Sequence, residues 1–151
     1  MRVETPVKLR ALKKPDIGAV ASLEALCPEA AQWGPEGYEQ VESGEIQGIV
    51  AERGSDLLGF IMARIAADEL EILNLAVNPK IRRQGIATHL LAEALYEARN
   101  RAVRRAFLEV RESNRAARTF YQSQGFRESG RRKGYYSQPC EDAVIYSLTF
   151  A

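Results

Sequence analysis

The stretch of sequence that decides the fold is residues 73–88, LNLAVNPKIRRQGIAT. Residues 73–77 have the apolar character of a strand, and Pro79 ends it because proline cannot donate to a sheet ladder. After the turn at residues 82–85, apolar side chains recur three and four positions apart, as on one face of a helix: Ala87, Leu90, Leu91, Ala94, Leu95 and Ala98. The order strand, tight turn, helix predicts a turn that can bind an anion at the head of that helix.

Four residues of this turn and helix start have properties suited to a diphosphate. The first N–H groups of a helix have no partner within the helix and carry the positive end of its dipole. Gly85 lets the backbone approach an anion, Ala87 keeps the next turn open, and Arg82 and Arg83 add positive charge. The alternative is an ordinary strand-to-helix turn with two solvated arginines. The chain contains neither G-x-x-x-x-G-K-S/T nor G-x-G-x-x-G, which excludes a P-loop and the dinucleotide fingerprint.

Composition narrows the class of protein. The 151 residues fit a single domain over residues 1–151, and 21 Lys and Arg against 20 Asp and Glu give no global field that demands nucleic acid or a membrane. The cysteines, Cys27 and Cys140, cannot make a disulfide framework, which favours a reducing, cytoplasmic location. Residues 1–12 lack the apolar core of a signal peptide, and no apolar run is long enough for a transmembrane helix. No group of residues has metal-ligand spacing, so we expect no metal.

The remaining periodicity predicts the order β-α-α-β-β-β-α-β-α-β-β, a mixed sheet covered by helices. The expected strands are residues 5–12, 48–52, 57–67, 69–78, 106–110, 126–130 and 143–150. The expected helices begin at Pro15, Gly34, Ile86 and Arg115, with Asn114 as the N-cap and Gly125 as the stop of the last one. Between Leu70 and Val77 the apolar positions change parity, which predicts a bulge near residues 72–74. A strand covered on both faces is the alternative.

Three segments together resemble the GNAT superfamily of N-acetyltransferases. They are Arg82-x-x-Gly85-x-Ala87 after Leu75-Ala76-Val77-x-Pro79, then residues 108–114, LEVRESN, and residues 120–126, FYQSQGF. The sequence is most similar to the bacterial RimI-like enzymes, which acetylate the N-terminal alanine of a small-subunit ribosomal protein. This resemblance implies an α/β fold of the α+β type, with four helices on a splayed, mostly antiparallel sheet of about seven strands.

The resemblance also implies an acetyl-CoA-dependent N-acetyltransferase and assigns its site. Acetyl-CoA would be bound by the backbone of Leu75, Ala76 and Val77, by the loop Arg82, Arg83, Gln84, Gly85, Ile86, Ala87 and Thr88, and by Asn114. Glu109 would be the general base and Tyr121 the general acid. Position alone favours a solvent-facing glutamate on a half-exposed strand at residue 109, and the role of base rests on the resemblance. Tyr121 could likewise be an amphipathic core tyrosine.

Other functions compete with this one. Seven arginines between residues 99 and 118 suggest an RNA-binding module, but Phe107 is the only aromatic residue in that stretch, which leaves no stacking platform. A catalytically silent acyl-CoA sensor is less favoured because Glu109 and Tyr121 are both present. Within the enzyme class, the acceptor could also be a small-molecule amine or another protein N-terminus. We expect residues 24–45 to form the acceptor side, a ribosomal protein N-terminus to be the partner, and neither membrane nor nucleic acid to be required.

Overall fold

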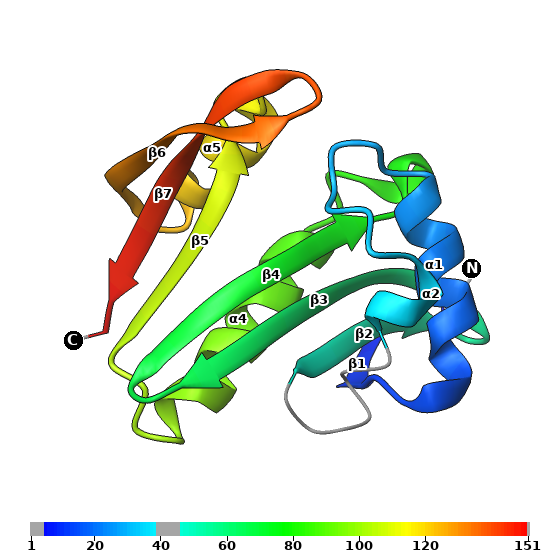
Figure 1. The fold of residues 1–151 in the computed structure, drawn as a ribbon. Coiled ribbons are helices and arrows are strands. Elements are labelled where there is room, and N and C mark those ends of the chain that lie inside the picture. The colour runs from blue at the N-terminus through cyan, green and yellow to red at the C-terminus, as the bar shows by residue number, and fades with distance from the viewer. Residues whose placement is uncertain (1–4, 39–45, 151) are drawn as a thin grey trace. The chain divides into compact units, whose positions relative to one another are not determined.

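The computed structural model describes residues 5–38 and 46–150, drawn as a ribbon in Figure 1. The chain forms two compact units, each built from two stretches of sequence. The first unit spans Met1–Arg64 and Leu73–Glu97, and the second spans Ile65–Ile72 and Ala98–Ala151. The chain passes from one unit to the other inside strands β3 (Asp56–Ala66) and β4 (Glu69–Val77) and inside helix α4 (Ile86–Arg99). A single domain over residues 1–151 stays a prediction.

The first unit begins with an antiparallel ladder of β1 (Lys8–Ala11), β2 (Gln47–Arg53) and β3. β2 and β3 form a hairpin, in which Arg53 pairs with Asp56 across the turn. Gly54 takes the left-handed conformation at that turn, with φ of 61°. The first strand is shorter than residues 5–12, since the alternation of apolar residues continues beyond the part that pairs with β2.

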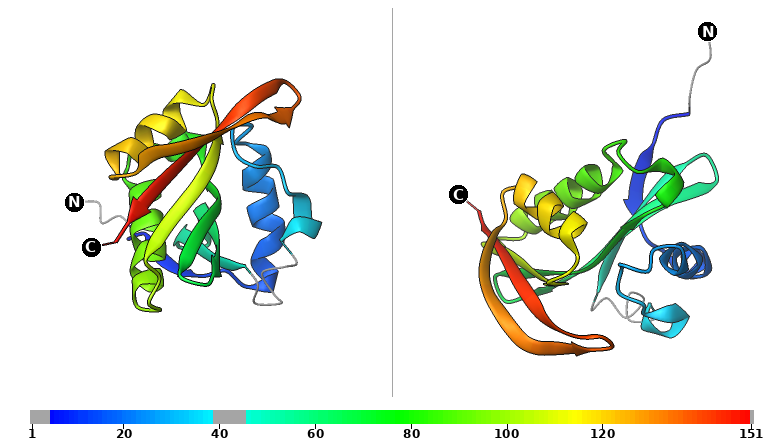
Figure 2. Two further views of the ribbon diagram at one scale, coloured as in Figure 1. Left: turned by 60° about the vertical axis from the view of Figure 1, so that its left-hand side comes forward. Right: turned by 90° about the horizontal axis from the view of Figure 1, so that it is seen from above.

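Helices cover both faces of the first unit, as Figures 1 and 2 show. The 3₁₀ turn η1 (Lys14–Asp16) leads into α1 (Ile17–Ala25), which lies with the single-turn α2 (Gly34–Gly37) on one face, while α4 lies on the other. The predicted helix from residue 34 does begin at Gly34, and residues 39–45 fall outside the described part of the chain. The core beneath α1 contains Tyr38, whose ring meets Phe60 edge-on at 6.0 Å and Trp33 at 5.2 Å between centroids.

The side chains near the end of β4 contact the core beneath α1. Ala76 belongs to the core cluster beneath α1, and the neighbouring Leu73 packs against the same cluster. The amide of Asn74 reaches the same side, where it bonds to Ala31 and Tyr38. The buried positions of β4 nevertheless alternate regularly, from Leu70 through Ile72 and Asn74 to Ala76, so the bulge near residues 72–74 stays a prediction.

The second unit is built on β5 (Arg105–Arg111), β7 (Cys140–Thr149) and β6 (Arg127–Ser137). β5 pairs with β7 and β7 with β6, both antiparallel, while residues Glu69–Ile72 of β4 join β5 in parallel. Helix α5 (Arg115–Ser123) covers one face, where Arg118 and Gln122 donate hydrogen bonds to the hydroxyl of Tyr146. Strands β6 and β7 are longer than predicted, because the residues of β6 are exposed or half-exposed and leave no apolar alternation to detect.

The strand order is β1-β2-β3-β4-β5-β7-β6, which confirms the predicted mixed, mostly antiparallel sheet of seven strands and the predicted order of elements. The splayed form of the sheet stays a prediction. Over the described residues, no helix has the length and apolar character needed to cross a membrane.

Candidate active site

The turn before α4 has the backbone expected of an anion site. After η2 (Pro79–Ile81), Arg83 and Gly85 both take left-handed conformations, with φ of 68° and 79°. The carbonyl of Gly85 accepts the first helical hydrogen bond, from His89 N at 3.0 Å, so Gly85 is the N-cap of a helix of 14 residues. Alternating left-handed residues turn successive N–H groups toward one side. A Cβ built on Gly85 meets no atom within 4 Å, so the space beside the helix start is open, as an anion site there requires.

Arg82 is engaged within the first unit. Its guanidinium pairs with Glu29, and its Nε donates to the carbonyl oxygen of Val77 at 3.3 Å. The sequence suggested a charge beside a phosphate, and the pairing instead gives Arg82 the task of joining the loop after α1 to the end of β4. Arg83 has an exposed side chain, for which no ion pair or hydrogen bond is found among the described residues.

The end of β4 brings the three predicted backbone residues to this same turn. Leu75 is half-buried, whereas Ala76 and Val77 are buried. The next residue, Asn78, donates its backbone N–H to Leu58 O at 2.8 Å, and its side chain accepts from Lys80 N at 3.0 Å. These contacts fix the exit of β4 and therefore the direction in which the loop leaves it.

A buried polar network on the other side of β4 was not predicted. Glu24 and Asn74 have only 3% and 5% of their surface exposed. The carboxylate of Glu24 accepts from Gly34 N at 3.0 Å and from the Tyr38 hydroxyl. Asn74 Nδ2 donates to Ala31 O at 2.9 Å. The network ties residues 31–38 to α1 and β4, which orders the segment expected to face the acceptor. Its members come from three distant parts of the sequence, so no local pattern announces it.

Glu109 lies on β5 directly after the residues that pair with β4. Its neighbours Leu108 and Val110 are buried, and Leu108 is in register with Tyr146, which faces α5. Glu109 therefore points to the face of the second unit that α5 does not cover. Its side chain is 14% exposed, and its Oε1 forms an ion pair with Arg132 Nε at 2.8 Å. The carboxylate of Glu109 is therefore largely covered and paired with an arginine, and its role as the base stays a prediction.

Tyr121 lies on α5 and is buried, with 7% of its surface exposed. Its ring meets Phe120 and Phe126 at 5.1 and 5.5 Å between centroids. Burial raises the pKa of the phenol above its usual value, which keeps the hydroxyl protonated as a donor. In the portion of the molecule that is described, this hydroxyl has no hydrogen-bond partner. Tyr121 comes from the α5 face of β5 and Glu109 from the opposite face, so the structure does not bring the two into direct contact.

Asn114 is confirmed as the N-cap of α5, because its Oδ1 accepts from Ala117 N at 3.1 Å. Gly125 takes φ of 93° and ends the helix as predicted. Burial raises the pKa of the Cys27 thiol, and its Sγ donates to Val77 O at 3.5 Å, so it has the properties of a structural cysteine. No cluster of metal-binding side chains is present within residues 5–38 and 46–150.

Comparison with known proteins identifies the family to which the chain belongs. The family model described as "Acetyltransferase (GNAT) family" matches residues 19–126. An Escherichia coli K12 protein named "[Ribosomal protein bS18]-alanine N-acetyltransferase" is 30% identical over 142 residues, covering 93% of this chain and 95% of that protein. The crystal structure of the ribosomal-protein-S18-alanine N-acetyltransferase from Escherichia coli has a TM-score of 0.85 at 28% identity, covering 97% and 95% of the two chains. A GNAT acetyltransferase from Elizabethkingia anophelis with acetyl-CoA bound shares the fold, with a TM-score of 0.78 at 19% identity and coverage of 95% and 98%.

Proposed function

Because the chain belongs to the GNAT family of acetyltransferases and is an N-acetyltransferase, we propose that it transfers the acetyl group of acetyl-CoA to the N-terminal amine of a ribosomal protein that begins with alanine. The transfer occurs by direct attack in a ternary complex. The observation that carries this proposal is the similarity to the Escherichia coli enzyme along nearly the whole of both chains. The alignment of 142 residues extends well beyond the cofactor motif.

In this proposal the first unit holds the nucleotide. The turn from Arg83 to Thr88 binds the diphosphate with N–H groups at the helix start, and Leu75, Ala76 and Val77 bind the pantetheine chain through their backbone. Arg82 holds the loop in place through Glu29. Asn114 contributes from the start of α5. When bound, acetyl-CoA supplies the thioester carbonyl that the acceptor amine attacks.

Glu109 and Tyr121 have complementary roles in that attack. An α-amine has a pKa near 7.7–8.0, so its deprotonation at pH 7 costs only about 1 kcal/mol, against roughly 4.6 kcal/mol for a lysine. One glutamate, acting directly or through a water, is a sufficient base for an α-amine. Tyr121 remains a donor because burial raises the pKa of its phenol, and its hydroxyl stabilises negative charge on the leaving sulfur.

Mass spectrometry of the products tests the acceptor. The purified protein is offered acetyl-CoA with a peptide that begins with alanine from a small-subunit ribosomal protein. Four other acceptors are tested in parallel: the same peptide with its N-terminus blocked, a lysine-containing peptide, polyamines and free amino acids. We expect a gain of one acetyl group on the α-amine of the first peptide. Acetylation of a polyamine or an amino acid in preference to the peptide would establish the small-molecule alternative instead.

A further inference from the structure

The face of the second unit that carries Glu109 holds two arginine–carboxylate pairs. Arg132 Nε lies 2.8 Å from Glu109 Oε1, which makes an ion pair, and Arg111 lies 3.0 Å from Glu141 Oε1. Glu141 also accepts from the N–H and hydroxyl of Ser113 at 3.1 and 3.0 Å. Arg111 is therefore committed to the start of α5, although it is the arginine closest to Glu109 in the sequence. The cation that Glu109 contacts comes from β6, two strands away.

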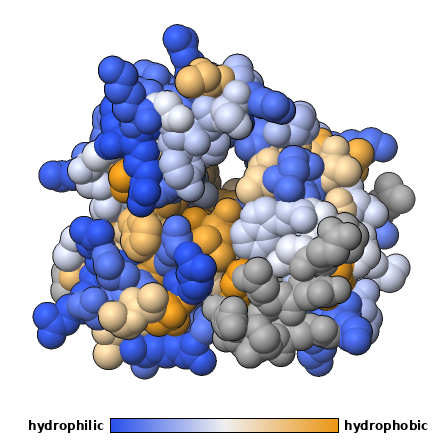
Figure 3. All heavy atoms as spheres, in the orientation of Figure 1, coloured by the Kyte–Doolittle hydropathy of each residue, from blue (hydrophilic) through white to orange (hydrophobic). Residues whose placement is uncertain are grey.

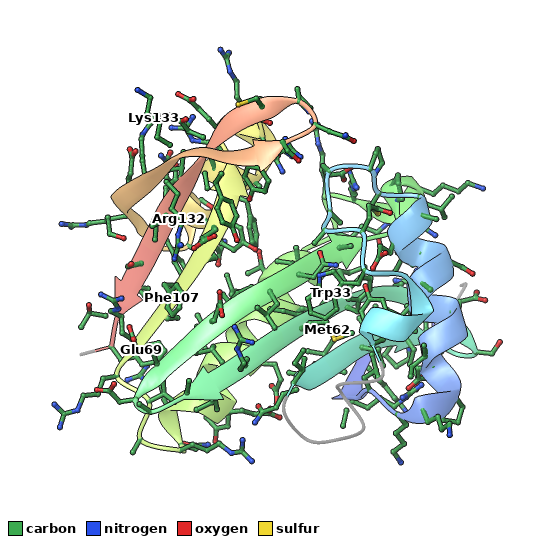
Figure 4. All side chains as sticks on the ribbon, viewed as in Figure 1. Trp33, Met62, Glu69, Phe107, Arg132 and Lys133 are labelled. Carbon is green, nitrogen blue, oxygen red and sulfur yellow. The ribbon has the colours of Figure 1, made fainter. Side chains whose placement is uncertain are left out.

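The register of the three strands explains how Arg132 reaches Glu109. Arg132 pairs with Ala143 on β7, while Glu109 pairs with Ile145 on the same strand. The ion pair thus runs diagonally over β7, and Ala143 has only a methyl group to obstruct the arginine stem. Gly130 pairs with Ile145 and adds no side chain beside Glu109. Figure 4 labels Arg132 over these strands and Lys133 at the outer edge of the hairpin.

The surroundings hold Arg132 in this position. Its guanidinium carbon lies 5.5 Å from the centroid of the Tyr135 ring, a cation–π distance. Arg132 is 57% exposed in its side chain, whereas Glu109 is 14% exposed, so the arginine approaches the carboxylate from solvent. The remaining carboxylate oxygen, Oε2, accepts no hydrogen bond from any residue in the described ranges. The contact therefore fixes one oxygen of Glu109 and leaves the other available.

We propose that Arg132 is the positioning residue for the base of the acetyl transfer: it holds Glu109 Oε1, so that Oε2 takes the proton of the acceptor amine directly or through a water. This inference rests on the proposed function, in which Glu109 is that base. Arg132 does not touch the reacting atoms. Its contribution is orientation, because an ion pair fixed at one oxygen restricts the rotation of the carboxylate.

A double-mutant cycle tests the inference. The variants are Arg132→Ala, Arg132→Lys, Glu109→Gln and the double variant, with Lys133→Ala as a matched control from the adjacent, exposed position. For each, kcat and the KM values for acetyl-CoA and an alanine-starting peptide are measured. Arg132→Ala should lower kcat about 10- to 100-fold, the scale of a small misplacement, with KM for acetyl-CoA unchanged. Arg132→Lys should recover part of the loss, and Lys133→Ala should behave as wild type.

The Glu109→Gln background decides the outcome, because Arg132→Ala should have little further effect once the carboxylate is gone. A loss for Arg132→Ala no larger than for Lys133→Ala, or an equal loss in both backgrounds, would overturn the inference. If instead Glu109→Gln has the kcat of the wild type, or the wild type acetylates no α-amine, the proposed function itself is wrong. Thermal melting of every variant shows whether a loss of activity comes from misfolding instead.

Discussion

At the scale of single residues, substitutions of Glu109 and Tyr121 should lower kcat/KM with different dependences on pH. Glu109→Gln keeps the size of the side chain but removes the base, so kcat/KM should fall by roughly 10²–10⁴ at neutral pH. That defect should shrink toward pH 9.5, because the acceptor amine then loses its proton to bulk water. Tyr121→Phe removes only the hydroxyl. Its defect should persist over the whole range, because burial raises the pKa of the phenol and keeps the wild-type hydroxyl protonated.

The measurement is kcat/KM for both variants from about pH 6 to 9.5, a window that spans the pKa of an α-amine. Both variants should bind acetyl-CoA as the wild type does, since neither side chain is assigned to the phosphates. Parallel pH profiles, or near-wild-type rates in either variant, would mean that these residues only fill their places in the fold.

Single residues also show what sequence could predict. Asn114 was predicted as a helix cap, and the structure confirms it because the signal and its partner, Ala117, lie three positions apart. The resemblance of the sequence to a family predicts Glu109 as the base, but it does not predict the ion-pair partner Arg132. The two are 23 positions apart and meet only through the order of β5, β7 and β6. Arg82 has the residue type of a phosphate ligand, but only the structure reveals Glu29 beside it.

At the scale of elements, the head of α4 and the β2–β3 hairpin offer a matched comparison. Gly85 and Gly54 both have positive φ, and a Cβ at either meets open space. Replacing either glycine with glutamate should therefore cost a similar 1–2 kcal/mol of stability, roughly, for the left-handed backbone. Only Gly85→Glu should abolish acetyl-CoA binding, because it places a negative charge at the proposed diphosphate site. Calorimetry that gives equal affinities for the two folded variants would remove the cofactor assignment.

The entry to α1 makes a second prediction at this scale. Arg10 of β1 bonds both oxygens of Asp16, at 2.7 and 2.8 Å, and Asp16 also accepts from Lys13 N. The hydrogen bonds from Arg10 lower the pKa of Asp16 below 3.8, so the folded state favours its ionised form. The stability from this contact is present above that value and is lost as pH falls through the folded pKa. Asp16→Asn should cost about 1 kcal/mol or less near neutral pH, the scale of a partly exposed ion pair.

Chemical denaturation at several pH values checks this prediction. The difference in unfolding free energy between wild type and Asp16→Asn should be constant near neutral pH and vanish in strong acid. Asp56→Asn, at the exposed start of β3, is the control and should show no such trend. A difference that is independent of pH down to the acid transition would show that the ion pair contributes nothing.

Elements were predicted well where side chains alternate in polarity and poorly where they do not. The helix face from Leu90 to Ala98 is buried as expected. β6 extends to Ser137, well beyond the predicted end, because an exposed outer strand needs no apolar residues. In Figure 3 the surface over this hairpin is correspondingly hydrophilic. Its pairing is dictated by β7, which sequence periodicity cannot reveal.

At the scale of the whole molecule, the arginines between residues 99 and 118 determine whether RNA is a partner. Several of them are used by the fold. Arg105 pairs with Glu69 at 2.8 Å, Arg111 with Glu141, and Arg118 donates to Glu112 O at 2.9 Å. Phosphates would have to compete with these contacts. We therefore expect nonspecific RNA to bind with a Kd of ~10⁻⁶ M or weaker and to be competed by CoA.

Titration with a labelled RNA at several salt concentrations checks this, since the slope of log K against log salt counts the phosphates that are neutralised. A Lys8→Glu variant, on β1, is the control for a change in overall charge. Tight binding that is indifferent to saturating CoA would favour the RNA-binding module over the enzyme.

The position of Trp33 beside Tyr38 makes its intrinsic fluorescence a probe of acceptor binding. Trp33 is the only tryptophan in the chain, and it lies in the segment expected to face the acceptor, with its ring 5.2 Å from that of Tyr38. Emission excited at the red edge of the protein spectrum comes from this one indole. A peptide that binds beside the ring should change the polarity around it, and therefore the emission wavelength and the fluorescence lifetime of Trp33. The tyrosines do not absorb at this excitation wavelength. Acceptor binding can thus be followed in the unlabelled protein.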